Sequence, residues 1–203
     1  MKSVVATLTF LLLISCTIEN DNVPLGFDQV YSDDPEQTMM IDIIYVQPTS
    51  VSQQSSYNLD ESDFIKNLNG SFFHRYGIGL EKGDIKTLIN DELYDLRDNR
   101  GEESRIFLMQ TQNSYNPNRV SLYIIKRAHT VNIAGIGKNQ RALITDEFLY
   151  TPTAPHEIGH ALGLLHSTIE GNVMSKIRPH LRREFTNAQV DQMKSVMKRI
   201  EDL

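Results

Sequence analysis

The pattern of apolar and polar residues along the chain predicts a succession of strands and helices. Short apolar runs that are rich in β-branched residues and bounded by turn residues are typical of buried strands. Apolar residues that recur at every third or fourth position are typical of helices with one face on a core. The strands predicted in this way are residues 39–47, 105–110, 120–126, 131–136 and 142–149. The helices predicted are residues 60–75 and 84–99, one that begins at about Pro155, and one that begins at Thr186.

Local signals define the ends of several of these elements. Asp84 is a suitable N-cap for the second helix, and Gly101 is a suitable residue to end it. The sequence from Thr186 to Gln189 reads as a capping box, which marks the start of the last helix. We therefore expect an α+β fold, in which helices pack on a twisted, mixed sheet of about four or five strands.

Length and charge restrict the classes of protein to consider. A chain of 203 residues is long enough for one domain with a sizeable core. The formal net charge is −6, and charges of both signs are spread along the chain. Proteins that bind nucleic acid usually carry a basic surface, and this composition provides none. We expect a monomer without a nucleic-acid partner.

The first residues resemble an export signal. Met1 and Lys2 precede an apolar stretch, residues 4–14, which is too short to remain as a membrane-spanning helix. The sequence Leu-Ile-Ser-Cys that ends at Cys16 is similar to a bacterial lipobox, in which the cysteine is acylated and becomes the mature N-terminus. Cys16 is the only cysteine, so no intramolecular disulfide can form. The alternative is an ordinary cleaved signal with an incidental cysteine.

These features divide the chain into three parts. Residues 1–15 are the predicted lipoprotein signal peptide, and residues 38–203 form the predicted folded domain. Residues 16–37 are polar and acidic, and we interpret them as a tether that separates the domain from the membrane. The predicted location is therefore the bacterial cell envelope, with the protein exported and anchored through lipidated Cys16.

One segment concentrates the residues that could carry chemistry. It begins at His156 and reads H-E-x-x-H-x-x-G-x-x-H. On a helix, His156 and His160 lie one turn apart on the same face. Gly163 allows a sharp turn, which can bring His166 back as a third imidazole. Three nitrogen ligands leave the fourth tetrahedral position open for water, as in catalytic zinc sites. The chance occurrence of the full pattern has a probability on the order of 10⁻⁵.

This segment, together with Asn172-Val-Met-Ser175, resembles the metzincin metalloproteases, and within them the matrixin branch most closely. The resemblance implies that His156, His160 and His166 bind one zinc ion. It also implies that Glu157 is the general base and that Met174 forms the turn beneath the metal. Two features differ from matrixins, because Ser-Lys follows Met174 in place of Tyr-Pro and no cysteine-containing latency motif is present.

The resemblance has further implications for the surroundings of the metal. It places the zinc helix under the lower edge of the sheet, and it places an edge strand, residues 131–136, beside the bound substrate. Residues 177–185 would form a wall of the pocket for the substrate residue just after the scissile bond. The acidic N-terminal segment has an alternative role, in which one of four aspartates caps the zinc, although a spacer is the favoured interpretation. These aspartates are Asp21, Asp28, Asp33 and Asp34.

We therefore predict a zinc-dependent endopeptidase that acts on proteins or peptides, with residues 38–203 as its catalytic domain. Glu157 would accept a proton from a zinc-activated water and deliver it to the leaving amine. Gly163 and Met174 would support the site. The alternative is a surface lipoprotein that binds zinc without catalysis, but a structural zinc normally has four protein ligands, and no fourth is evident in the motif.

Overall fold

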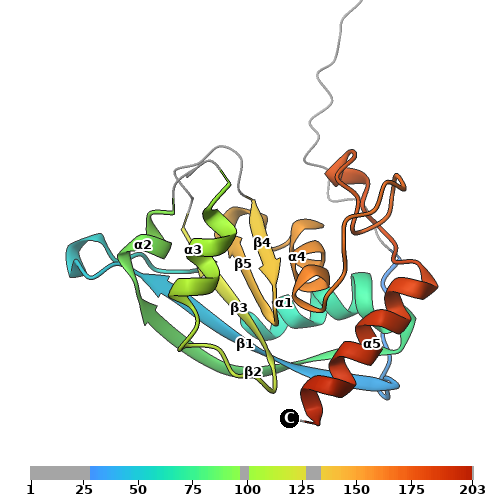
Figure 1. Cartoon of the computed structure of the whole chain (residues 1–203). Helices are drawn as coiled ribbons and strands as arrows, with labels where there is room; N and C mark the ends of the chain where they lie inside the picture. Colours follow the sequence, from blue (N-terminus) through green and yellow to red (C-terminus); the bar gives the residue numbers. More distant parts are fainter. Residues whose placement is uncertain (1–27, 97–100, 127–133, 203) are drawn as a thin grey trace, which may run out of the picture.

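Five strands form one mixed sheet in the order β2-β1-β3-β5-β4 (Figure 1). The computed structural model describes residues 28–96, 101–126 and 134–202. β1, β2, β3 and β5 run parallel to one another, and β4 pairs antiparallel with β5 at one edge. This architecture confirms the predicted α+β fold. The strands are β1 (Gln37–Gln47), β2 (Ile78–Ile89), β3 (Val120–Ile125), β4 (Gly135–Lys138) and β5 (Arg141–Thr145).

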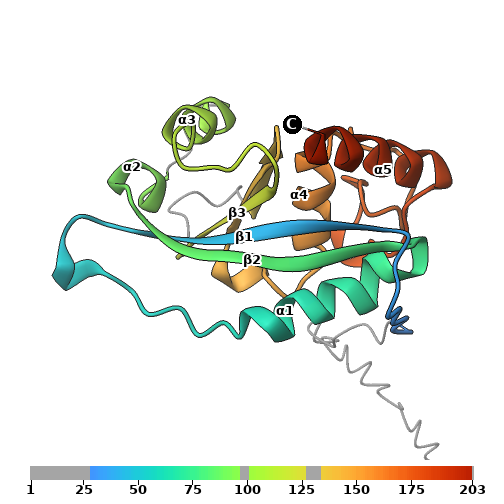
Figure 2. The same ribbon diagram turned by 90° about the horizontal axis from the view of Figure 1, so that it is seen from below.

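Helices cover both faces of the sheet. α2 and α3 lie on one side of β1 and β2, and α1 lies on the opposite side (Figure 2). The central strands are therefore buried on both faces, which explains their almost continuous apolar sequences. The helices are α1 (Glu61–Leu68), α2 (Asp91–Tyr94), α3 (Glu103–Gln110), α4 (Thr153–Ala161) and α5 (Asn187–Glu201).

Two apolar cores follow from this arrangement. The larger core joins one face of the sheet to α1, α4 and α5, and the smaller core joins the other face to α2 and α3. Met174 and Ile158 belong to the larger core, so the active-site helix and the segment beneath it are part of the main packing of the domain. None of the helices in the described parts of the chain is long and apolar enough to cross a membrane.

The helix predicted at residues 84–99 is wrong over most of its length. β2 occupies Ile78–Ile89, and in the described part of the predicted range, which ends at residue 96, the short α2 is the helix that follows it. The apolar spacing in this region fits a helix, but pairing with β1 along the whole strand determines the structure, because long-range sheet contacts override local periodicity. Asp84 does not cap a helix; its backbone N–H donates to Asp42 Oδ1 at 2.9 Å.

The strand predicted at residues 105–110 is also wrong, because these residues form most of α3. The apolar run at residues 106–109 has four residues, and so short a run fits either structure. Ile106 and Phe107 are buried on the smaller core, whereas Met109 is exposed, and the helix achieves this by turning its apolar side to α2 and the sheet. The predicted strand-type alternation would have buried Met109 together with Phe107.

The other predicted elements are confirmed, with shifted ends. The first predicted helix is α1, which continues as a π-helical turn (Asn69–Phe73) and a 3-10 turn (His74–Tyr76). β5 ends earlier than predicted, at Thr145. β4 overlaps the predicted strand 131–136 only at its end, and residues 131–133 lie outside the described part. Asn139 and Gln140 connect β4 to β5 with φ values of 50° and 61°, as in a two-residue hairpin turn.

A buried carboxylate fixes the register between β1 and its neighbours. Asp42 lies at a bulge in β1, with its side chain 1% exposed. It accepts from Arg119 Nη1 at 2.9 Å, from Lys86 Nζ at 3.1 Å and from the backbone of β2. Burial raises the pKa of Asp42, but these three donors outweigh burial, and the pKa is lowered overall. The charge is therefore compensated within the sheet.

Residues 28–36, which we assigned to the tether, contact the domain. The N–H of Val30 donates to Gly70 O at 2.8 Å, and the ring of Tyr31 lies where a side chain at Gly70 would be. The predicted signal peptide and the lipidation site at Cys16 lie outside the described residues, so both stay predictions.

Candidate metal centre

The end of α4 is shaped by Gly163, as the motif predicts. Gly163 has φ +86°, which a residue with a side chain adopts with difficulty. Its N–H donates to His160 O, and the N–H of Leu164 donates to Gly159 O at 2.9 Å. These two bonds form a Schellman motif, which ends the helix and reverses the chain. The reversal brings His166 back toward the helix face that carries His156 and His160.

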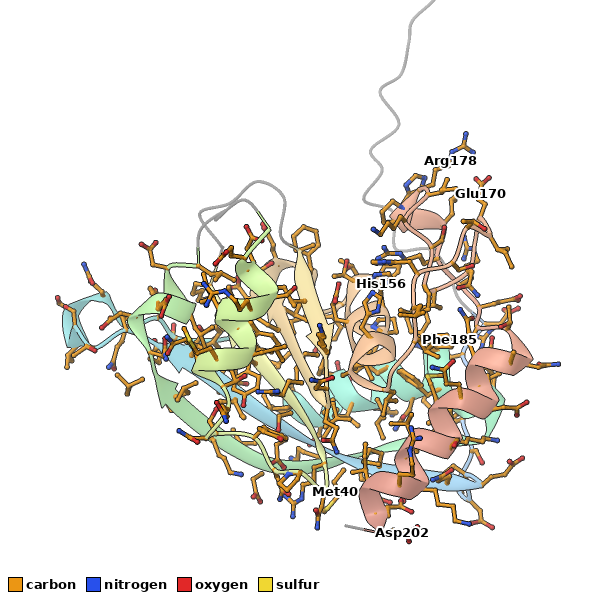
Figure 3. All side chains as sticks on the ribbon, viewed as in Figure 1. Met40, His156, Glu170, Arg178, Phe185 and Asp202 are labelled. Atoms are coloured by element: carbon orange, nitrogen blue, oxygen red, sulfur yellow. The ribbon has the colours of Figure 1, made fainter. Side chains whose placement is uncertain are left out.

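The three predicted histidines meet at one point. His160 Nε2 lies 3.2 Å from His156 Nε2 and 3.0 Å from His166 Nε2. A tetrahedral zinc ion with bonds of about 2.05 Å separates its nitrogen ligands by about 3.3 Å, so this spacing suits zinc. Figure 3 shows His156 on α4, on the side of the loop that rises to Arg178 and Glu170.

The hydrogen bonds of the Nδ1 atoms of His156 and His160 explain why the Nε2 atoms of this cluster suit a cation. His156 Nδ1 lies 2.7 Å from Val173 O, and His160 Nδ1 lies 2.8 Å from Leu164 O. A carbonyl oxygen only accepts, so each Nδ1 must carry the proton and each Nε2 must present a lone pair. Two lone pairs that face each other at 3.2 Å cannot share a hydrogen bond. A metal ion placed between them resolves this conflict, and the donor set therefore fits zinc.

Met174 lies directly beneath the cluster. It is fully buried, and a Cβ at Gly159 of α4 would lie 2.6 Å from its Sδ atom. Asn172 holds the turn, because its Oδ1 accepts from the N–H of Met174 and its Nδ2 donates to Gln189 Oε1 at 2.8 Å. Gln189 belongs to the predicted capping box of α5, which the structure confirms. The last helix is thus bonded to the floor of the site.

Glu157 is placed beside the cluster without joining it. Its Oε1 lies 4.0 Å from His156 Nε2, and the residue is 7% exposed. Burial raises the pKa of Glu157 to about 8, although Arg182 opposes this shift. A carboxyl group in this position can exchange a proton close to neutral pH.

The histidines are held in the form that binds a metal. Burial, followed by the charge of Arg182, lowers the pKa of His156 to about 3. Burial and the neighbouring His160 lower the pKa of His166 to about 4. Burial also lowers the pKa of His160. All three imidazoles are therefore neutral at neutral pH, which leaves their lone pairs available.

Two glycines of β4 were missed by the sequence analysis. A Cβ at Gly137 would lie 2.1 Å from Glu157 O and 2.6 Å from His160 Cβ, and a Cβ at Gly135 would lie 2.5 Å from Glu157 Cγ. Both residues therefore let α4 lie directly against the edge strand. Their i, i+2 spacing on a strand was the available signal, because it places both on one face.

Arg182 was also missed. It is buried, and its Nε donates to Ser175 O at 2.8 Å, next to Met174. Its charge interacts with Glu157 and with each of the three histidines. The sequence gives no local signal for this position, since Arg182 is one of several basic residues in its segment.

The other described histidines, which we did not predict as ligands, and the described aspartates considered as zinc caps lie outside the cluster. His74 Nδ1 accepts from the N–H of Ser32 at 2.9 Å, and His180 is exposed in a 3-10 turn. Among the described residues, the groups that could hold a metal contain neither of these histidines nor the aspartates considered as caps. Asp21 and His129 lie outside the described residues.

Comparison with known families agrees with this geometry. A family model described as Peptidase M10, Matrixin, matches residues 16–198. The chain belongs to the matrixin family. No curated protein sequence matches this matrixin in a direct comparison.

Comparison with solved structures gives matches at low sequence identity, of which the first below has a TM-score above 0.5. Archaemetzincin from Methanopyrus kandleri matches with a TM-score of 0.54 and 14% identity, over 79% of this chain and 96% of that one. Metalloproteinase-II from Bacteroides fragilis matches with a TM-score of 0.45 and 17% identity, over 89% of this chain and 57% of that one. A zinc-dependent peptidase from Methanocorpusculum labreanum matches with a TM-score of 0.43 and 12% identity, over 75% and 99% of the two chains.

The family membership and the site agree with each other. This matrixin is a zinc metalloendopeptidase, and its cluster of His156, His160 and His166 fits one catalytic zinc ion. The predictions of a metzincin, of an α+β fold and of a zinc cofactor are confirmed. The roles of the individual site residues stay predictions.

Proposed function

We propose that this matrixin hydrolyses internal peptide bonds with His156, His160 and His166 as the zinc ligands and Glu157 as general base and acid. The observation that carries the proposal is the position of Glu157, which is buried and 4.0 Å from a ligand nitrogen, yet outside the ligand cluster. Zinc held by the three imidazoles would supply Lewis-acid activation of a water molecule and of the scissile carbonyl.

Glu157 supplies the proton transfers in this mechanism. Its carboxylate takes a proton from the attacking water and later gives it to the nitrogen of the leaving amine. Gly135 and Gly137 hold the carboxylate in place, since the backbone of β4 lies against its side chain and its helix. His156 and His160 are held by the carbonyls of Val173 and Leu164, so neither imidazole needs to reorient during the reaction.

The substitution Glu157→Gln tests this assignment. The amide keeps the shape of the side chain but cannot accept a proton, so kcat should fall by at least about 10³–10⁴-fold. Zinc content, measured by elemental analysis, should stay at about one equivalent. An active Glu157→Gln variant would refute the mechanism. A zinc-loaded wild type that cleaves no member of a broad peptide library would favour the alternative of a non-catalytic zinc-binding lipoprotein.

We also propose that β4 receives the substrate as an additional strand. In the described part of the chain, β4 pairs only with β5, and its other edge is unpaired. Its glycines lie against Glu157 and His160, so this edge runs past the catalytic groups. An extended peptide can satisfy the unpaired backbone groups of such an edge. N-methylation of a good peptide substrate at a paired position should weaken cleavage strongly, and unchanged kinetics at every methylated position would exclude the arrangement.

We further propose that the protein is an exported lipoprotein anchored through Cys16. The sequence that ends in Leu-Ile-Ser-Cys supports this proposal. Expressed with its signal in a host that processes lipoproteins, the wild type should partition into the detergent phase, and Cys16→Ala should remain in the aqueous phase. A wild type that is released entirely without lipid would refute the proposal.

A further inference from the structure

Residues 28–36, which we call the strap, are held on the domain by specific contacts. The N–H of Val30 donates to Gly70 O at 2.8 Å, and the ring of Tyr31 fills the space that a side chain at Gly70 would need. Figure 2 shows the strap, in dark blue, at the start of β1 and beside the continuation of α1. Gly70 therefore provides a docking position for the strap at the end of α1.

Two further contacts hold the ends of the strap. Arg75 Nη2 donates to Asp28 O at 2.7 Å, and Lys194 Nζ of α5 donates to Glu36 Oε2 at 2.5 Å. Arginine, lysine and glutamate keep their charges between about pH 5 and pH 8. These two contacts, like the backbone bond of Val30, are therefore insensitive to pH in that range.

The contact between Ser32 and His74 is different, because one partner titrates. The N–H of Ser32 donates to His74 Nδ1 at 2.9 Å. A backbone N–H can only donate, so Nδ1 must present a lone pair, and the proton of the neutral ring must be on Nε2. A second proton can bind only at Nδ1, where it replaces the lone pair that accepts from Ser32. Protonation of His74 is thus incompatible with this hydrogen bond.

The groups around His74 determine how protonation and docking compete. Burial lowers the pKa of His74 below its ordinary value of 6.5, and Asp33 of the strap opposes this shift only in part. The ring of Tyr31 meets the imidazole edge-on, with 6.3 Å between the centroids. The neighbouring charges on the domain are Arg75, next to His74 in the chain, and Lys66 of α1, whose Nζ lies 5.7 Å from the centroid of Tyr31. Both are cations, so neither offers a partner to a protonated imidazole.

We propose that His74 is an acid-sensitive latch, which holds the strap on the domain at neutral pH and loosens it when the imidazole is protonated. Docking should be at full strength above the ordinary histidine pKa of 6.5 and should weaken as the pH falls below it, since the docked state binds the proton less readily. A loosened segment is open to proteases, whereas a docked one is protected. Acid would therefore favour cleavage within the strap. The inference goes beyond the proposed function and does not depend on the zinc chemistry.

The test measures hydrogen exchange of the strap in the zinc-loaded protein. The protection of the Val30 and Ser32 amides, relative to an unstructured chain at the same pH, reports how often the strap leaves the domain. It is measured about 1.5 pH units above and below the ordinary pKa of histidine. We expect both protection factors to fall about fivefold at the lower pH, the factor that corresponds to one ordinary hydrogen bond. The amide of Val190, which donates to Thr186 O in α5, should keep its protection.

Variants assign the pH response to His74. His74→Asn removes the titration but retains an acceptor, because Asn Oδ1 can take the place of Nδ1, so the strap should stay protected at both pH values. Lys194→Ala removes the contact with Glu36, and it should lower the protection by the same factor at both pH values. His180→Asn is the matched control, since it makes the same substitution at an exposed histidine in another turn, and it should respond to pH as the wild type does.

Several results would overturn the inference. Equal protection of the strap at both pH values in the wild type would do so even if the variants failed to fold. A gain of protection in acid, which Asp33→Asn abolishes, would show that protonated His74 holds the strap through Asp33 instead. A loss of protection in acid that persists in His74→Asn would assign the pH response to another group. None of these results depends on peptide cleavage, so they leave the proposed function unaffected.

Discussion

The substitution Gly137→Ala should damage the active site from outside it, through the contact between β4 and α4. The added Cβ would lie 2.1 Å from Glu157 O and 2.9 Å from Glu157 C, both of which are backbone atoms. A carbon and a carbonyl oxygen normally approach to about 3.3 Å. The strand or the helix must therefore move by about 1 Å, because backbone atoms cannot rotate away as the end of a side chain can.

The geometry of this contact gives the expected loss of stability and the expected loss of activity. Overpacking of a tight core contact costs about 1–3 kcal/mol, which corresponds to a decrease in Tm of about 2–12 °C in a chain of this length. α4 carries His156, Glu157 and His160, so its displacement also misplaces the catalytic groups. A shift of about 1 Å at such groups can reduce the rate by about 10²-fold. We expect kcat/KM of Gly137→Ala to fall by that factor, with a lower zinc affinity.

Gly135→Ala provides a comparison at the next position on the same face of β4. Here the nearest atom is Cγ of Glu157, at 2.5 Å, and this side chain can rotate; the backbone atom Leu143 O lies at 3.0 Å, a much milder contact than the 2.1 Å at Gly137. The stability should fall less than in Gly137→Ala, while kcat falls because the general base is displaced. Zinc content should remain near one equivalent. Lys138→Ala, at an exposed position of the same strand, is the control and should resemble the wild type.

Three measurements decide the outcome: thermal unfolding followed by circular dichroism, zinc content after gel filtration, and kcat/KM on one peptide. If Gly137→Ala unfolded at the wild-type temperature and kept the wild-type kcat/KM, the close packing of β4 on α4 would not support the site. If Gly135→Ala lost its zinc while Gly137→Ala kept it, the separate roles of the two glycines would be refuted.

Other parts of the structure give further predictions. Asp42→Asn should destabilise the fold by about 1–3 kcal/mol, because it weakens the buried hydrogen bonds from Arg119 and Lys86, which keep only the exposed Asp84 as a charged partner. The pKa of Asp42 is lowered in the folded state, so its carboxylate stabilises the fold at pH values above the unfolded-state pKa of 3.8. The difference in unfolding free energy between wild type and Asp42→Asn should therefore be constant above pH 3.8 and shrink as the pH falls below it. Urea titrations that give the same difference at every pH would contradict this. His160→Ala should lose its zinc, and a variant that retains one equivalent would show that the ligand assignment is wrong. Gln189→Ala should lower the unfolding free energy by about 1–2 kcal/mol, because the capping box and the bond to the Met174 turn are both lost, and an unchanged denaturation midpoint would argue against that link.

The sequence alone determined the chemistry of the site, because that chemistry depends on local spacing. His156 and His160 share a helix face through the period of the helix, and Gly163 reverses the chain through its own backbone freedom. The Thr186 capping box and the apolar strands β1 and β3 were likewise predicted, since each depends on neighbouring residues or on a continuous apolar run. Such features depend only on residues that are close together in the sequence, so they can be predicted without knowledge of the tertiary contacts.

Only the tertiary structure decided the features that join distant segments. β2 is a strand because β1 offers a partner along its whole length, although its own spacing suggests a helix. Arg182 becomes part of the site because the chain folds back on Ser175, and Gly137 matters because α4 packs on β4. The carbonyls that fix the two imidazoles come from Val173 and Leu164, beyond the end of α4. Such contacts depend on which surfaces meet in three dimensions, and the residue types at these positions do not specify their partners.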